Sequence, residues 1–249
     1  RICLVGSEMC IRDSNEDVTV TTVYPSSNSY ATIAFEDNWP LKGDYDFNDV
    51  VWRYKVTEQL NGQRELKNLT VDYTLQAMGA GYSNGYAVKL PNVLPANVAS
   101  TTLTRNGVAV GHTILQAGDS ETILMVSENL REDLENLGEL TESCVFYRTQ
   151  SACSGVQNAD VLNYQLYVEF TTPVSRDDIG YPPYDSFIFG ADGTYHGDFV
   201  TTPPGMTWQT HLKEFSGTSD MNDTLFNSHD DSSSAVSYTH LRAHETDTD

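Results

Sequence analysis

The sequence predicts an all-β fold, an antiparallel β-sandwich that is jelly-roll-like and carries one short helix. Short runs of β-branched and aromatic residues recur along the 249 residues, separated by Gly, Asn, Asp and Pro. In the run 50–56, apolar and polar residues alternate with the period of two that a half-buried strand shows. Asn61-Gly62 is a hairpin-turn dipeptide. A chain of these elements must bury its apolar faces by packing sheet on sheet.

The individual elements follow from the same patterns. In the run 129–137, Leu130, Leu134 and Leu137 recur at helical spacing and Gly138 provides a stop, so this run predicts the helix. Strands are predicted over residues 30–35, 50–57, 69–77, 85–90, 99–104, 121–127, 162–170 and 186–190.

The two ends of the chain do not read as protein sequence. Residues 4–14 (LVGSEMCIRDS) can be written in codons whose opposite strand encodes residues 236–245 (VSYTHLRAHE), and the DNA resembles a transposon-type sequencing adapter. Folding or function would not produce that relation, so such segments are excluded from fold reasoning. We predict adapter-derived segments at 1–14 and 235–249, a single β-sandwich domain at 15–215, and an acidic, Ser-rich, partly disordered segment at 216–234.

The chain is strongly acidic, with a formal net charge of −21 at pH 7. Without the two predicted adapter segments the charge is still about −19. A surface this negative repels phosphate backbones and attracts divalent cations, so we expect no nucleic-acid partner. The sequence has no window of about 18 apolar residues, so it predicts no transmembrane segment within this stretch.

Cys144 and Cys153 close a short loop and could meet across a turn. A disulfide between them would indicate an oxidising compartment outside the cytosol. Two free, buried cysteines are the alternative.

The most informative segment is the acidic loop at 44–49. Asp44, Asp46 and Asn48 repeat the D-x-[DN]-x-[DN] spacing of the first three ligands of an EF-hand. The rest of that template fails, because Asp49 stands where it needs glycine and Lys55 where it needs glutamate. What remains is a tight cluster of oxygen ligands that leads directly into a strand.

We predict that this loop holds a structural Ca²⁺ ion. Carboxylates this close repel one another unless a cation lies between them, and calcium accepts six to eight oxygens in a loose geometry that suits the loop better than magnesium's. An Asx-rich turn whose side chains cap backbone N–H groups is the alternative. The leading ligands are Asp44, Asp46 and Asn48, with Asp49, Glu36 and Asp37 as additions from the same loop.

At these residues the chain resembles a known family. The stretch 32–40 (TIAFEDNWP) followed by 43–49 (GDYDFND) is similar to the signature of LruC-type domains, a DUF4842-like domain of unknown function in bacterial surface proteins and lipoproteins. The stretches 76–80, 84–88 and 181–188 resemble later blocks of the family. The resemblance implies an all-β module exported to the envelope or surface of Gram-negative bacteria, with no established catalytic activity.

The chain departs from that family after the 181–188 block, where an acidic-His-Leu stretch is expected. His196 and His211 stand in different surroundings here. They could approach one another across a hairpin and form a second metal site, although scattered histidines are more often surface or packing residues.

We therefore predict a domain that is not an enzyme, either secreted or displayed on the bacterial outer surface, with the periplasm as a further location. Its expected role is adhesion or binding of an extracellular ligand, either a glycan or a surface protein. The sequence contains no G-x-S-x-G or H-E-x-x-H motif. The alternative is a carbohydrate-binding module that uses exposed aromatic residues, and the candidates are Tyr181, Tyr184 and Trp208. A glycan-active enzyme, which needs paired carboxylates across a groove, is the least favoured hypothesis.

Overall fold

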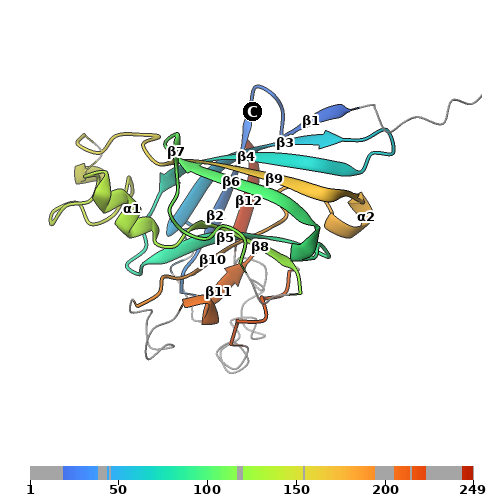
Figure 1. Cartoon of the computed structure of the whole chain (residues 1–249). Coiled ribbons are helices and arrows are strands. Elements are labelled where there is room, and N and C mark those ends of the chain that lie inside the picture. Colours follow the sequence, from blue (N-terminus) through green and yellow to red (C-terminus); the bar gives the residue numbers. More distant parts are fainter. Residues whose placement is uncertain are drawn as a thin grey trace, which may run out of the picture.

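The computed structural model describes residues 19–38, 44, 46–116, 120–153, 155–193, 205–213, 215–222 and 243–248. Within them the chain forms two antiparallel sheets that pack face to face, so the predicted all-β sandwich is confirmed (Figure 1). Among these residues one helix is longer than a single turn, which agrees with the one short helix predicted from the sequence. The predicted disordered segment lies mostly outside the described residues.

The larger sheet has the strand order β12-β2-β3-β4-β9-β6-β7, with β1 pairing to β3 off this path. β1 and β2 share one edge of β3, since Tyr24 pairs with Val56 and Ala31 with Tyr54. β12 pairs through its backbone with β2 and lies within the predicted adapter segment, whose origin stays a prediction. The strands are β1 (Val20–Tyr24), β2 (Tyr30–Phe35), β3 (Val50–Leu60), β4 (Leu66–Ala77), β6 (Val98–Arg105), β7 (Val108–Ala109), β9 (Asn163–Val174) and β12 (Ala243–Thr248).

The smaller sheet has the order β11-β10-β5-β8 and is covered on both faces. One face joins the main core, and the other carries a small cluster that includes Met125, Phe187 and Phe189. This is why the three longer strands of this sheet are buried at every position rather than at every second one. The strands are β5 (Asn84–Leu90), β8 (Thr122–Ser127), β10 (Asp185–Gly190) and β11 (Gln209–His211).

The main core lies between the sheets and is rich in aromatic rings. β3 turns Val50, Trp52, Tyr54 and Val56 inward, as its alternation predicts. The Trp52 ring lies 4.9 Å, centroid to centroid, from Tyr86 of the opposite sheet. Such contacts between large rings account for much of the burial that holds the two sheets together.

The predicted helix is α1 (Leu130–Asn136). The side chain of Asn129 accepts hydrogen bonds from two N–H groups of the first turn, and Gly138 follows the helix with a φ of 75°. A second, four-residue helix was not predicted: α2 (Arg176–Ile179), capped by Ser175. Single 3₁₀ turns occur at η2 (Pro95–Asn97), η3 (Ser151–Cys153) and η4 (Gly205–Thr207). In the described part of the chain no helix is long and apolar enough to span a bilayer.

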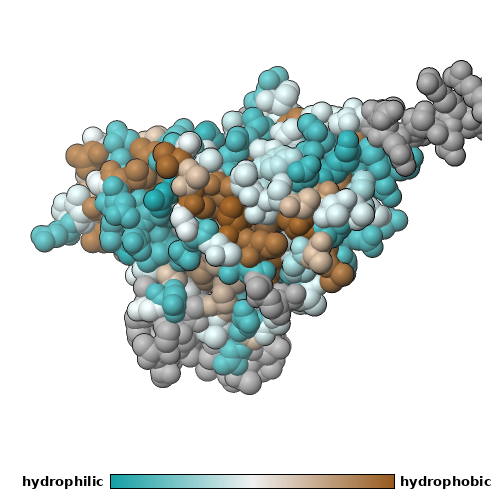
Figure 2. Space-filling view, in the orientation of Figure 1, coloured by the Kyte–Doolittle hydropathy of each residue, from teal (hydrophilic) through white to brown (hydrophobic). Residues whose placement is uncertain are grey.

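The surface seen in Figure 2 mixes hydrophilic areas with apolar patches, the largest of which lies over the region of β6 and β8.

The strands β1, β7 and β11 were not predicted, because they are short and their sequences carry little alternation. These strands form because a neighbouring strand offers backbone N–H and C=O groups to pair with, which the local sequence does not show.

Candidate metal centre and ligand pockets

The acidic loop is held together at its base by the pairing of β2 with β3. Phe35 pairs with Val50, so the residues that follow β2 and those that precede β3 lie side by side. Carboxylate oxygens of Glu36, Asp44 and Asp46 lie within 4.8 Å of one another. Three carboxylates at this separation are a suitable partial ligand set for a hard divalent cation.

Glu36 is the buried member of this cluster, with 4 % of its surface exposed. Its Oε1 accepts a hydrogen bond from the Phe47 N–H at 2.6 Å, while its Oε2 is buried without a hydrogen-bond partner among the described residues. Phe47 has a φ of 51°, a left-handed conformation that is unfavourable for a bulky residue. Leaving a carboxylate oxygen buried and unpaired is costly. A cation bound to Glu36 Oε2 would remove that penalty.

The other predicted ligands lie around this cluster. Asn48 donates a hydrogen bond from Nδ2 to Asp46, and a 180° turn of its amide would present Oδ1 instead. Asp49 Oδ2 accepts the Asp37 N–H at 2.7 Å, and Asp37 Oδ2 accepts from Asn84 Nδ2 at 2.9 Å. Asp37 and Asp49 are therefore engaged in supporting the loop, whereas Glu36, Asp44 and Asp46 are the residues brought together.

Without a cation, Glu36, Asp37, Asp46 and Asp49 resist ionisation. Burial, together with the charge of Asp49, raises the pKa of Glu36 to about 7. Burial and Asp49 also raise the pKa of Asp37 well above its usual value. The pKa values of Asp46 and Asp49 are raised as well, first by burial and then by neighbouring carboxylates. A bound cation would reverse these shifts, because it stabilises the ionised form.

The loop also depends on Gly79, which follows the end of β4. Gly79 donates its N–H to the Asn48 carbonyl at 2.8 Å, and a Cβ on Gly79 would lie 1.8 Å from Asn48 Oδ1. Gly79→Ala must therefore displace Asn48, and overpacking of this kind costs about 1–3 kcal/mol. We expect calcium affinity, measured by titration calorimetry, to fall roughly tenfold. Gly81→Ala is the control, since its Cβ would meet nothing within 4 Å. Equal affinity in both variants would show that Asn48 is not part of the site.

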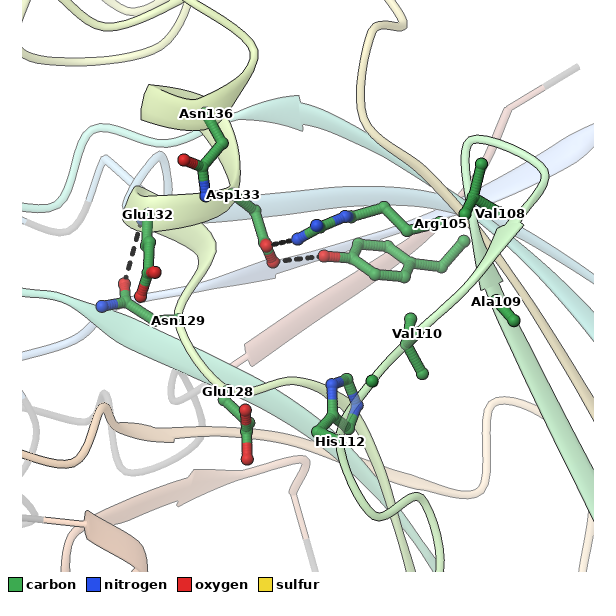
Figure 3. A pocket seen from close by; sticks show the side chains of 12 residues that line it. Arg105, Val108, Ala109, Val110, His112, Glu128, Asn129, Glu132, Asp133 and Asn136 are labelled. Atoms are coloured by element: carbon green, nitrogen blue, oxygen red, sulfur yellow. Dashed lines mark hydrogen bonds and ion pairs between the residues drawn. The ribbon is translucent and has the colours of Figure 1, made fainter.

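A second polar centre lies beneath α1, at the base of an open pocket of about 330 Å³ (Figure 3). Asp133 accepts hydrogen bonds from Ser127 Oγ at 2.6 Å and from the Tyr164 hydroxyl, and it pairs with Arg105. The Asp133 side chain points into the sandwich, and only 12 % of it is exposed. It ties α1 to strands of both sheets, so we regard this centre as structural.

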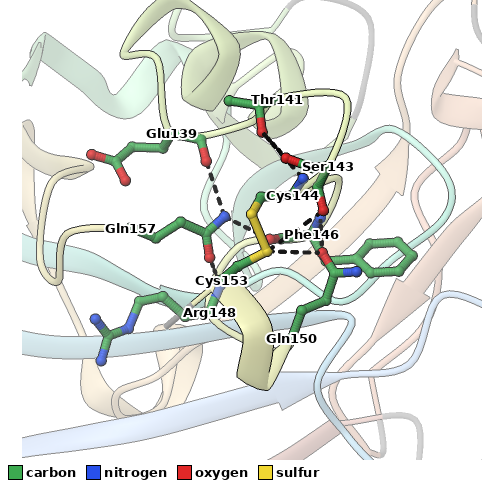
Figure 4. Close-up of a disulfide and its surroundings, with 9 residues drawn as sticks. All are labelled: Glu139, Thr141, Ser143, Cys144, Phe146, Arg148, Gln150, Cys153 and Gln157. Carbon is green, nitrogen blue, oxygen red and sulfur yellow. Dashed lines mark hydrogen bonds between the residues drawn. A yellow bond between two sulfur atoms is a disulfide. The ribbon is translucent and has the colours of Figure 1, made fainter. Parts of the chain in front are cut away.

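The predicted disulfide between Cys144 and Cys153 is confirmed (Figure 4). Around it, Gln157 donates from Nε2 to the carbonyls of Glu139 and Phe146, at 2.9 and 2.7 Å. The bond thus fixes a loop whose backbone polar groups are also held by hydrogen bonds to side chains such as Gln157, Gln150 and Thr141.

Removal of this disulfide by Cys144→Ala/Cys153→Ala is expected to destabilise the domain by about 2–3 kcal/mol. The effect is moderate because closing a short loop removes only a moderate part of the conformational entropy of the unfolded chain. Urea denaturation of the oxidised protein and the double variant measures the difference. Dithiothreitol should lower the stability of the oxidised protein and leave that of the variant unchanged. If reduction has no effect on either, the bond contributes nothing.

Two of the three predicted ligand-binding aromatic residues are buried, which corrects that prediction. Tyr184 is 1 % and Trp208 0 % exposed, because both fill the core, and the Tyr184 hydroxyl donates to Glu58. Tyr181 is 72 % exposed. Of the predicted set, only Tyr181 is available to a ligand.

His211 is a buried packing residue. Its ring stacks on Phe187 at 4.3 Å, Nδ1 lies 2.9 Å from Asp185, and Nε2 lies 2.7 Å from Gln209 Oε1. Both ring nitrogens are thus engaged. His196 lies outside the described residues, so the suggested histidine pair stays a prediction.

Among the buried charges that were not recognised in the sequence, two leave a signal there. Glu58 occupies an inward-facing position of β3, in register with Trp52 and Val56, and is 4 % exposed. Asp133 lies three residues after Leu130 on the buried face of α1. A charged residue at a core position of a regular pattern must have a buried partner, and here the partners come from distant segments.

Comparison with known proteins gives a family and a fold. The sequence model of a domain of unknown function, DUF4842, matches residues 64–245. A solved structure of a protein from Bacteroides ovatus, provisionally described as a lipoprotein, has a similar fold, with a TM-score of 0.57 and 13% sequence identity. The alignment covers 91% of this chain and 65% of that one, so this chain spans less than two thirds of its length. No protein with a curated description matches the chain.

The matched residues include the later blocks on which the family resemblance rests and begin after the acidic loop. The match also runs into the segment 235–249, for which we predict an adapter origin. Because it spans well over half of the chain, the chain belongs to the DUF4842 family.

Proposed function

We propose that the domain is a calcium-stabilised, non-catalytic module of the bacterial cell surface that binds an extracellular ligand and thereby mediates adhesion. The observation that carries the calcium assignment is the Glu36–Asp44–Asp46 cluster, in which Glu36 Oε2 is buried and has no hydrogen-bond partner within the described part of the chain. The ion would fix the β2–β3 loop and perform no chemistry.

Three further features support this role. The disulfide is of a kind that persists in oxidising compartments, as at a cell surface. The fold likeness to a protein described as a lipoprotein supports an envelope location. The negative charge of the chain concentrates divalent cations near its surface.

Calcium titration of the native protein and of Glu36→Gln tests the proposal. Native protein should bind Ca²⁺ in preference to Mg²⁺, and Glu36→Gln should lose at least roughly tenfold in affinity, because it removes the buried anionic ligand. Glu142→Gln makes the same change of charge at an exposed glutamate and should bind normally. Native protein without measurable calcium binding at millimolar concentration would refute the assignment.

A further inference from the structure

A second pocket, distinct from the acidic loop, lies where α2 and the residues after it meet the strands β1 and β3. It has a volume of about 500 Å³, within the range of small-ligand sites. Tyr24, Leu60 and Pro182 give it apolar walls, while Arg64, Arg176 and Tyr181 add polar and aromatic groups. Figure 1 shows α2 beside the ends of β4 and β9, on the side of the sandwich away from α1.

The base of this pocket is built around a buried ion pair. Glu58 accepts hydrogen bonds from both terminal nitrogens of Arg176, from the Tyr184 hydroxyl, and from Thr22 Oγ1 at 3.0 Å. Arg176 Nη1 also donates to the Gly180 carbonyl at 3.1 Å. The Glu58 charge is thus neutralised within the fold. Its role is to hold Arg176 in place, and it is not available to bind a cation.

Arg176 in turn positions the exposed ring. Its guanidinium lies 5.0 Å from the centroid of Tyr181, a cation–π contact that orients the ring at the rim of the pocket. Because Tyr181 is 72 % exposed, it offers apolar ring surface to a ligand. An oriented, exposed aromatic ring beside a pocket suits a ligand with a flat apolar face, such as the C–H face of a pyranose.

The charge of the pocket selects further among such ligands. Arg64 and Arg176 carry positive charge and Glu58 carries negative charge, so the pocket has a net charge of about +1 in a chain of net charge −21. Arg64 lies in the turn between β3 and β4 and its side chain is exposed. A guanidinium pairs with a carboxylate through two parallel hydrogen bonds. The rest of this acidic surface would repel an anionic ligand.

We propose that this pocket binds an acidic sugar, a pyranose ring that carries a carboxylate, with the ring against Tyr181 and the carboxylate against Arg64. This inference rests on the ligand-binding half of the proposed function and is independent of its calcium half. An Asp or Glu side chain of a protein partner would supply the carboxylate but would lack a flat apolar face that could pack against the Tyr181 ring.

Binding of a defined uronic-acid oligosaccharide, measured by titration calorimetry on the full chain, tests the proposal. The neutral oligosaccharide of the same length and a sulfated one are the comparison ligands. Tyr181→Ala and Arg64→Ala should each weaken uronate binding by about tenfold or more. Tyr181→Phe should bind like the native protein, because it keeps the ring. Thermal melts establish that each variant is folded.

Arg148→Ala is the matched control for Arg64→Ala. Arg148 is likewise exposed and likewise has a left-handed backbone, with a φ of 60° against 65° for Arg64, but it lies in the disulfide loop. Normal uronate binding by this variant supports the site. Equal binding of the neutral or the sulfated oligosaccharide overturns the carboxylate assignment, and the absence of binding to all three overturns the site. Uronate binding that persists in chelator supports the pocket even if the calcium assignment fails.

Discussion

Asp133→Ala is expected to destabilise the domain by about 3 kcal/mol, near the lower end of the range for breaking a buried ion pair. The lower end applies because Arg105, its ionic partner, is 40 % exposed in its side chain and can be rehydrated. The loss leaves the Ser127 and Tyr164 hydroxyls without their acceptor. For a domain of this size the melting temperature should fall by about 6–12 °C.

Glu132→Ala provides the control, because Glu132 is the exposed neighbour of Asp133 on the same helix. Its melting temperature should stay within about 2 °C of the native value, as for most surface substitutions. A double-mutant cycle with Tyr164→Phe separates the hydroxyl contact from the ion pair. If Asp133→Ala and Glu132→Ala have the same melting temperature, Asp133 does not anchor α1 to the sheets, and the polar centre beneath α1 is not structural.

Calcium removal is expected to produce the second large effect. At a free calcium concentration 100 times the Kd, binding to the folded state alone stabilises it by about 2.7 kcal/mol. Chelation should therefore lower the melting temperature by about 5–10 °C. The same calcium concentration should stabilise Glu36→Gln by about half as much or less, because its affinity is at least roughly tenfold lower, so chelator should lower its melting temperature correspondingly less.

The pH dependence in chelator has a defined sign. The pKa of Glu36 in the cation-free fold is about 7, above its ordinary value of 4.5. Below pH 4.5 Glu36 is protonated in both folded and unfolded chains and contributes no difference. Between pH 4.5 and 7 the unfolded chain ionises first, so its contribution to stability should fall by on the order of 3 kcal/mol and then level off.

Calcium should reverse that dependence. A bound cation holds the carboxylates ionised, so the stabilisation should be present at neutral pH and lost on acidification, as protons compete for the same oxygens. Chemical denaturation from pH 4 to 8, with calcium and with chelator, gives the two curves. Parallel curves would mean that no cation binds at Glu36. Glu36→Gln in chelator should lose the fall between pH 4.5 and 7 that Glu36 contributes.

Much of the fold can be predicted from the sequence because strand periodicity is a local property. Alternation identified the inward face of β3 from Val50 to Val56, and the leucine spacing with Gly138 identified α1. The acidic loop could be found because its carboxylates are adjacent in sequence, and Cys144 and Cys153 are only 9 residues apart. The acidic loop and the disulfide loop are both short, so a few backbone angles constrain which of their side chains can meet.

The sequence by itself determined the all-β class, most strands, the helix and the acidic loop, and it left open whether Cys144 and Cys153 form a disulfide or stay free. Only the tertiary structure decided which aromatic rings are exposed, since Tyr184 and Tyr181 are close in sequence yet one fills the core and the other lies at a pocket rim. It also decided the pairing of Glu58 with Arg176 and of Asp133 with Arg105, partners 118 and 28 residues apart. Such contacts depend on how two sheets pack, and local periodicity carries no information about that packing.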